Sequence, residues 1–260
     1  MLNVHDFKQY RTKIGFANQN DLKIFLSAKD IKSIIDYSYI DSLNIRICEI
    51  IKRLNHIVHQ SITIQNIDEF CKTYIDKVYK ILKTSNLLPR LNNQGRRPEQ
   101  VYFSWMRGQV ISQFFTKALA LIFEVEQSSI KVIGNDNIND IENFKRQPTA
   151  DLQIEIDEKI IQIEIQSGYQ GINDIKQHKV LQGKRQFIDK QIRSLVIHFD
   201  LFNGQVAFVD ISNINDNDIN WITRQQMEGQ TVFNISQQHF IWSLSTQPPK
   251  LKDIQEFILE

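Results

Sequence analysis

The sequence predicts an α/β (α+β) protein, in which a central mixed β-sheet is flanked by helices and preceded by an N-terminal helical region. Apolar residues recur at helical spacing before residue 90, and polar and apolar residues alternate along 151–166. Strand-like segments follow a further helical stretch toward the C-terminus. This order of elements favours a mixed sheet with helices on both faces.

The N-terminal third carries the helical pattern. Apolar faces recur along 45–59 and 67–83 at the spacing of amphipathic helices. The segment 84–98 holds two of the chain's five prolines and a glycine, so it is the clearest break in the sequence. We therefore expect a helical region over residues 1–95 and a second region over 96–260.

The second region begins with a long helix. Pro98 fits the first turn of a helix that runs to about Glu124. A short strand over 129–134 and a polar loop over 134–147 are predicted next.

Residues 151–166 predict a β-hairpin. The register that pairs apolar with apolar joins Leu152 to Ile163 and Ile154 to Ile161, with a two- or four-residue turn around Asp157 and Glu158. The same register sets Asp151 opposite Glu164, where Cβ atoms lie about 5 Å apart.

Two opposed carboxylates repel each other unless a positive group balances them. A divalent cation such as Mg²⁺ suits two oxygen ligands of this kind. The alternative is an ordinary hairpin whose polar face is simply hydrated.

A turn over 167–171 and a helix capped by Asn173 are predicted after the hairpin. The remaining predicted elements are strands over 194–199, 205–211, 231–236 and 239–244, and a C-terminal helix from Pro248 to Glu260.

The sequence Pro148-Thr149-Ala150-Asp151, followed by Glu164-Ile165-Gln166, resembles the signature of the PD-(D/E)XK nuclease superfamily, which includes most type II restriction endonucleases. Gln166 stands where that family usually has lysine, and Pro148 is not directly before Asp151. The resemblance covers residues 100–212 in element order and implies a restriction-endonuclease-like core.

The resemblance implies Asp151, Glu164 and Gln166 as catalytic residues. It also implies that Asp151, Glu164 and the backbone carbonyl of Ile165 bind Mg²⁺, for which Mn²⁺ can substitute. Gln166 is neutral but can hydrogen-bond a water molecule. Lys176 or Lys179, on the following helix, could supply the missing positive charge.

Double-stranded DNA is the implied partner. Guanidinium groups grip phosphates or guanine edges, and amides can contact adenine. We expect DNA contacts from basic and amide side chains before the long helix, at the start of the later helix and in a loop after it: Arg96, Arg97, Asn173, Lys176, Lys179, Lys184 and Arg185. The alternative is a set of solvated surface charges.

The amino-acid composition further narrows the class of protein. The formal net charge of +1 argues against a histone-like or ribosomal binder. Cys48 and Cys71 lie on apolar helical stripes and are expected to be reduced. We see neither a signal peptide nor a membrane span, so we expect a cytoplasmic protein.

The sequence therefore predicts a metal-dependent, sequence-specific DNA endonuclease. A palindromic site would call for a homodimer, and residues 1–95 would help to dimerise the protein or clamp DNA. The rivals are another nuclease of the same fold (repair, nicking or junction-cleaving), an inactive DNA- or protein-binding module of that fold, and an unrelated α+β protein.

Overall fold

The computed structural model describes residues 3–28, 31, 33–91, 96–134, 150–225 and 229–255. By its contacts the chain forms two compact units. One comprises residues 1–49 and 71–107, and the other comprises 50–70 and 108–260. The sequence-based border between a helical region (1–95) and a second region (96–260) stays a prediction. The two units are grouped by contacts, which do not measure whether a region folds independently.

The N-terminal part is helical, as predicted. The helices are α1 (Val4–Ile14), α2 (Gln19–Leu26), α3 (Tyr37–Ile57), α4 (Ile67–Cys71), α5 (Lys77–Thr84), α6 (Pro98–Phe123), α7 (Gln177–Lys190) and α8 (Leu251–Ile254). A π-helical turn, Lys72–Asp76, joins α4 to α5. The long helix predicted from Pro98 is confirmed. The predicted C-terminal helix is present as α8, but it begins at Leu251 rather than at Pro248. It is described as far as Ile254, and residues 256–260 lie outside the described ones.

Two buried polar contacts organise the first unit. The Tyr102 hydroxyl donates to Asn44 Oδ1 at 2.7 Å. Glu99, whose side chain is fully buried, accepts from Arg97 and from the backbone N–H of Asp36. Burial alone would raise the pKa of Glu99, but these donors together hold it below its usual value.

The second unit contains two sheets. The six-stranded sheet has the order β1-β2-β3-β5-β6-β9, in which only β3 and β5 run parallel among adjacent strands, and the three-stranded sheet has the order β4-β8-β7. The strands are β1 (Lys131–Val132), β2 (Leu152–Ile156), β3 (Lys159–Gly168), β4 (Asp174–Lys176), β5 (Arg193–Asp200), β6 (Gln205–Asp210), β7 (Trp221–Arg224), β8 (Gln230–Asn234) and β9 (Phe240–Ser243). The predicted mixed sheet is therefore confirmed.

The predicted hairpin is also confirmed, with its register. Leu152 pairs with Ile163, and Ile154 pairs with Ile161. The turn is the two-residue form, because Ile156 pairs with Lys159. Asp157 and Glu158 both have positive φ, 49° and 62°, as a type I′ turn requires.

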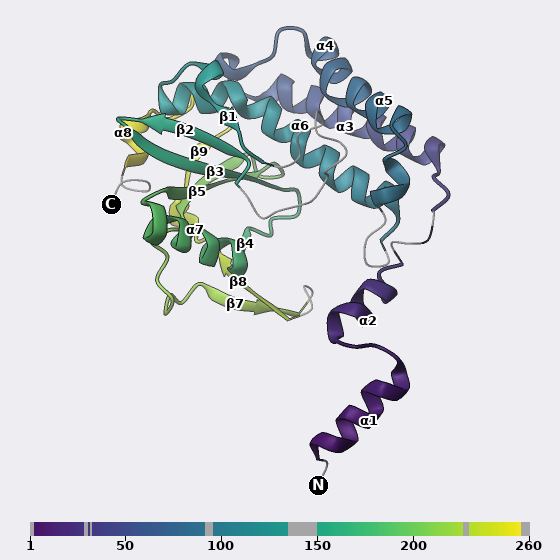
Figure 1. Cartoon of the computed structure of the whole chain (residues 1–260). Helices are drawn as coiled ribbons and strands as arrows, with labels where there is room; N and C mark the ends of the chain where they lie inside the picture. Colours follow the sequence, from purple (N-terminus) through teal and green to yellow (C-terminus); the bar gives the residue numbers. More distant parts are fainter. Residues whose placement is uncertain are drawn as a thin grey trace. The chain divides into compact units, whose positions relative to one another are not determined.

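The six-stranded sheet is covered on both faces. On one face, the ring of Phe115 from α6 stacks on Phe199 of β5, with 4.0 Å between centroids. On the other face, a buried apolar cluster joins α7 and the three-stranded sheet to β5 and β6. Figure 1 shows α7, β4, β7 and β8 together on this second side. We call it the α7 face.

Two details after the hairpin differ from the prediction. Asn173 does not cap a helix, because Asp174–Lys176 forms β4 and α7 begins only at Gln177. The side chain of Asn173 bonds His198 instead. Lys184 and Arg185 lie within α7 rather than in a loop beyond it, because the helix continues to Lys190. A hydrophobic interior position at Val180 and close packing at Gly183 hold this helix on the sheet.

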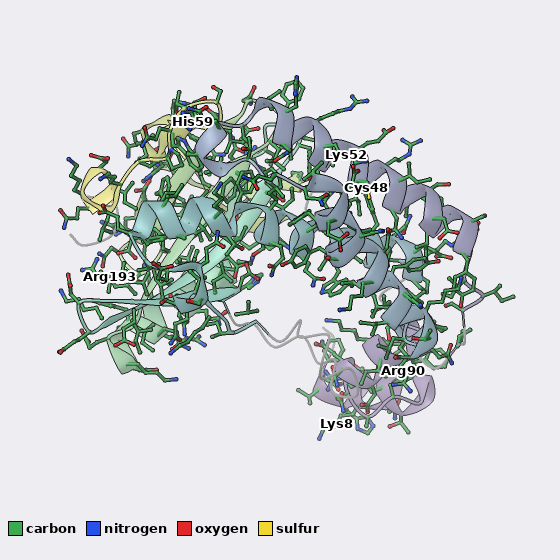
Figure 2. The ribbon with its side chains drawn as sticks, turned by 90° about the horizontal axis from the view of Figure 1, so that it is seen from above. Lys8, Cys48, Lys52, His59, Arg90 and Arg193 are labelled. Carbon is green, nitrogen blue, oxygen red and sulfur yellow. The ribbon has the colours of Figure 1, made fainter. Side chains whose placement is uncertain are left out.

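The end of α3 is tied to the C-terminal segment within the second unit. Figure 2 shows His59 beside the yellow C-terminal ribbon, where its N–H donates to the carbonyl of Leu244 at 2.8 Å. The His59 ring bonds Ser61. None of the described helices has both the length and the apolar character needed to span a membrane.

Candidate active site

Asp151 is fixed against the backbone of β3. Its N–H donates to the carbonyl of Ile163 at 3.1 Å, and its Oδ2 accepts from the N–H of Ile165 at 2.7 Å. The carboxylate thus satisfies a backbone donor of β3 two residues beyond Ile163, which pairs with Leu152, the first residue of β2. The N–H and C=O of one strand residue point to the same side, so the carbonyl of Ile165 also points toward the side that carries Asp151.

Glu164 lies on the α7 face of the sheet. It is paired in register with Val196, which belongs to the buried cluster on that face. Lys179 of α7 places its ammonium group on the Glu164 carboxylate. The side chain of Glu164 is 18% exposed and that of Lys179 is 29% exposed. The ion pair is therefore partly screened from solvent but still reached by it.

A small pocket of about 30 Å³ opens beside this ion pair. Its lining combines both charged groups with amides of α7 and β3 and with small residues: Ala150, Gln162, Glu164, Lys179, Gln182, Gly183, Gln186 and Ser194, together with Leu195 and Ile211. A space of this size admits a water molecule. The charged pair therefore borders a small space with a mixed polar and apolar lining.

Gln166 follows Glu164 by two residues and shares its face. It pairs in register with His198 of β5. Its Oε1 is buried and has no hydrogen-bond partner among the described residues. A buried carbonyl oxygen without a donor costs free energy, which marks this position as one that a water or a ligand would stabilise.

The negative charges of Asp151 and Glu164 are balanced differently from what the sequence predicts. Opposed carboxylates were predicted to need a cation between them. Instead, the N–H of Ile165 binds Asp151, and Lys179 neutralises Glu164. Like-charge repulsion alone therefore does not require a metal ion here.

The donor set still fits a hard cation. Two carboxylates and a strand carbonyl are all oxygen donors, as Mg²⁺ prefers. Among the described residues there is no group of three or more His, Cys, Asp or Glu side chains placed to hold a metal ion. Any ion at this position would thus have two carboxylate ligands and would keep several waters.

The predicted DNA-binding residues lie in different surroundings. Lys179 belongs to the site itself, and Lys176 lies at the start of α7. Lys184 forms an ion pair with Asp216 at 2.5 Å, whereas Arg185 is exposed on α7. Asn173 is occupied by an internal contact with His198.

Arg96 and Arg97 lie before α6 in the first unit. Arg97 makes a two-point contact with Glu99, at 2.9 and 3.2 Å. Arg96 is exposed, and its guanidinium donates to the carbonyl of Gln100 at 3.5 Å. Pro148 and Thr149, the first residues of the signature, lie outside the described residues.

Sequence analysis missed a second polar cluster on the α7 face. His198 is 3% exposed and Asp200 is fully buried. Asn173 bonds both, with His198 Nε2 at 2.7 Å from its Oδ1 and Asp200 Oδ2 at 3.5 Å from its Nδ2. A histidine and an aspartate at alternate positions of an otherwise apolar strand were the signal that could have revealed it.

No protein-family model and no curated protein matches the chain.

Proposed function

We propose that this protein is a metal-dependent endonuclease that hydrolyses double-stranded DNA at specific sites, as a type II restriction enzyme does. The observation that carries the proposal is the placement of Asp151 on the N–H of Ile165 and of Glu164 and Gln166 on one face of β3, with Lys179 of α7 on Glu164. The resemblance of this segment to the PD-(D/E)XK signature gave Asp151, Glu164 and Gln166. The lysine comes from α7 rather than from the strand.

Asp151, Glu164 and the carbonyl of Ile165 would hold Mg²⁺, or Mn²⁺ in its place. When bound, such an ion neutralises phosphate charge and lowers the pKa of a coordinated water. The oxygen donors described above fit that role.

Lys179 takes the place of the lysine that the signature lacks at Gln166. Its ammonium lies on Glu164 and borders the pocket. A cation at this point attracts a phosphate and stabilises negative charge that develops on it. Gln166, which is neutral, supplies a hydrogen-bond acceptor that fixes a water.

The remaining parts of the proposal concern partners. The exposed cations Arg96 and Arg185 are candidates for phosphate contacts, since such contacts supply most of the hydrogen bonds in protein–DNA interfaces. A palindromic recognition site would be read by a homodimer, with residues 1–95 aiding dimerisation or clamping DNA. As a restriction enzyme the protein would act in the cytoplasm.

Digestion of plasmid and phage DNA with Mg²⁺ or Mn²⁺ tests the proposal. We expect the wild type to give discrete fragments and Asp151→Asn or Glu164→Gln to lower the cleavage rate at least ~100-fold, because each removes charge at the ion. Lys179→Met is expected to lower it ~10–100-fold. Lys190→Met is the matched control, since Lys190 lies in the last turn of the same helix, is exposed and is not among the residues expected to contact DNA.

Cleavage that survives both carboxylate substitutions would place the active site elsewhere. Equal losses in Lys179→Met and Lys190→Met would mean that only the general charge of α7 matters. Activity confined to nicked or branched DNA would indicate a repair or junction-cleaving nuclease instead.

A DNA-binding module without catalysis is the second candidate. The occupation of Glu164 by Lys179 favours it, because the same contact would stabilise a fold that has lost its ion. Calorimetric titration with Mn²⁺ separates the two. The nuclease binds the ion and loses that binding in Asp151→Asn, whereas the module shifts duplex DNA on a gel without binding the ion.

A further inference from the structure

His198 is buried next to Gln166 and uses only one of its two ring nitrogens. Its Nε2 lies 2.7 Å from Asn173 Oδ1. The ring edge faces Phe240, with 6.4 Å between centroids. Nδ1 is buried and has no hydrogen-bond partner among the described residues.

The surrounding network sets the tautomer of His198. Asp200 accepts from the Nδ2 of Asn203 at 2.7 Å and from the Nε2 of Gln205 at 3.2 Å. Its Oδ2 also faces the amide nitrogen of Asn173. Turning that amide over would bring its oxygen against the carboxylate, so Oδ1 must face His198.

An amide oxygen only accepts hydrogen bonds. His198 therefore carries its proton on Nε2 and donates it to Asn173, and Nδ1 keeps an unshared lone pair. Burial lowers the pKa of His198 to about 4, against the opposing charges of Asp200 and Asp174. The ring is thus neutral at physiological pH, in agreement with this tautomer.

Gln166 presents a second unpaired acceptor at the neighbouring position. It lies opposite His198 on the adjacent parallel strand, so the two side chains share the α7 face. Gln166 Oε1 and His198 Nδ1 are both acceptors and cannot bond each other. A water, which has two O–H donors, satisfies both at once.

We propose that Gln166 and His198 together hold one water molecule, with each accepting one of its protons, and that His198 is a positioning residue of the candidate nuclease site. The inference rests on the proposed function and deepens it. A water that donates both protons to fixed acceptors directs its oxygen lone pairs away from them. That is the orientation a nucleophilic water needs, and it assigns a task to glutamine at the position where the signature has lysine.

Two substitutions of His198 separate the roles of its nitrogens. The amide of asparagine occupies roughly the place of Nδ1, whereas the amide of glutamine reaches the place of Nε2. We expect His198→Asn to keep the water and retain cleavage within about 10-fold of wild type. We expect His198→Gln, which keeps only the bond to Asn173, to lower kcat ~10–100-fold with KM for DNA unchanged.

The opposite order would overturn the proposal, since it would show that only the anchor to Asn173 matters. Equal kcat for the two variants would overturn it as well. Thermal unfolding of both variants, with rates compared only for protein that unfolds cooperatively, separates these outcomes from loss of the fold.

A spectroscopic test does not depend on cleavage. Long-range ¹H–¹⁵N correlation spectra of the histidine rings are expected to show His198 protonated on Nε2, with an Nδ1 resonance that shifts in Gln166→Leu. A proton on Nδ1, or a resonance that ignores Gln166→Leu, would overturn the proposal. If the wild type cleaves no DNA, the proposed function fails while the spectra still decide the water site.

Discussion

Two carboxylates on the α7 face, Glu164 and Asp200, are balanced in different ways. Glu164 is partly exposed beside a small pocket of mixed lining and is paired with the flexible ammonium of Lys179. Asp200 is fully buried and, among the described residues, accepts from neutral donors of Asn203, Gln205 and Asn173. An acid whose hydrogen bonds are all made inside the fold serves structure. An acid held by one mobile cation beside a pocket remains able to exchange partners.

Removal of Asp200 is expected to have the largest effect on stability. Asp200→Ala removes a buried carboxylate together with its hydrogen bonds from Asn203, Gln205 and Asn173, and should lower the free energy of unfolding by about 3 kcal/mol. Chemical denaturation measures it. Glu164→Gln is the matched variant and should change stability by less than about 1 kcal/mol. Similar losses in both would erase the distinction between the two acids.

The stability of the buried part of the α7 face, around His198, should also decrease in acid. The folded pKa of His198, about 4, lies below its ordinary value of 6.5, so its contribution to stability is complete above pH 6.5 and is lost as pH falls toward 4. The loss should be on the order of 3 kcal/mol, because one pKa unit corresponds to about 1.4 kcal/mol. Denaturation of wild type and His198→Gln across this range measures it.

The fall in the free energy of unfolding with decreasing pH should be shallower in His198→Gln, but it should not vanish. Burial also lowers the pKa of His178 and of His239, so both add to the slope in the same direction. An unchanged slope would show that His198 does not titrate differently in the folded and unfolded states.

The close approach of α7 to the six-stranded sheet affects both the packing of the fold and the ion pair of Lys179 with Glu164. A Cβ at Gly183 would lie 2.8 Å from Ile211 Cγ1 and 3.1 Å from Ser194 Cβ. Gly183→Ala should therefore cost about 1–2 kcal/mol through overpacking and, by lifting α7, weaken the contact of Lys179 with Glu164. Thermal unfolding and DNA cleavage measure both effects.

Gly108 provides the control for this helix substitution. It lies within α6, and a Cβ there meets no atom within 4 Å. Gly108→Ala should raise stability by about 0.5–1 kcal/mol, because alanine favours helix. A stabilising Gly183→Ala would contradict the close approach of α7.

The smallest effect is expected at the ion pair of Lys184 with Asp216. The acid is 78% exposed, and such pairs contribute about 0–1 kcal/mol. Lys184→Met should therefore leave the melting temperature nearly unchanged. If Lys184 also contacts DNA, the variant will bind every duplex more weakly and with a shallower salt dependence. A salt dependence equal to that of wild type would exclude that contact.

The local pattern determined much of the fold. Alternation along 151–166 gave the hairpin register, because a slip by one residue would turn Leu152 and Ile163 out of the core. Pro98 gave the start of α6 for a similarly local reason, since proline suits the first turn of a helix. Spacing also placed Asp151 beside β3, and Glu164 and Gln166 on one face of that strand.

Only the tertiary structure decided what these residues meet. Lys179 reaches Glu164 because Gly183 lets α7 approach the sheet closely. His198 stands beside Gln166 because β5, thirty-two positions later in register, pairs parallel with β3. Asn173, which looked like a helix cap, became the link between His198 and Asp200. Sequence spacing fixes neighbours along a strand or helix, whereas contacts between distant segments depend on how the elements pack, and these contacts set the charge balance of the site.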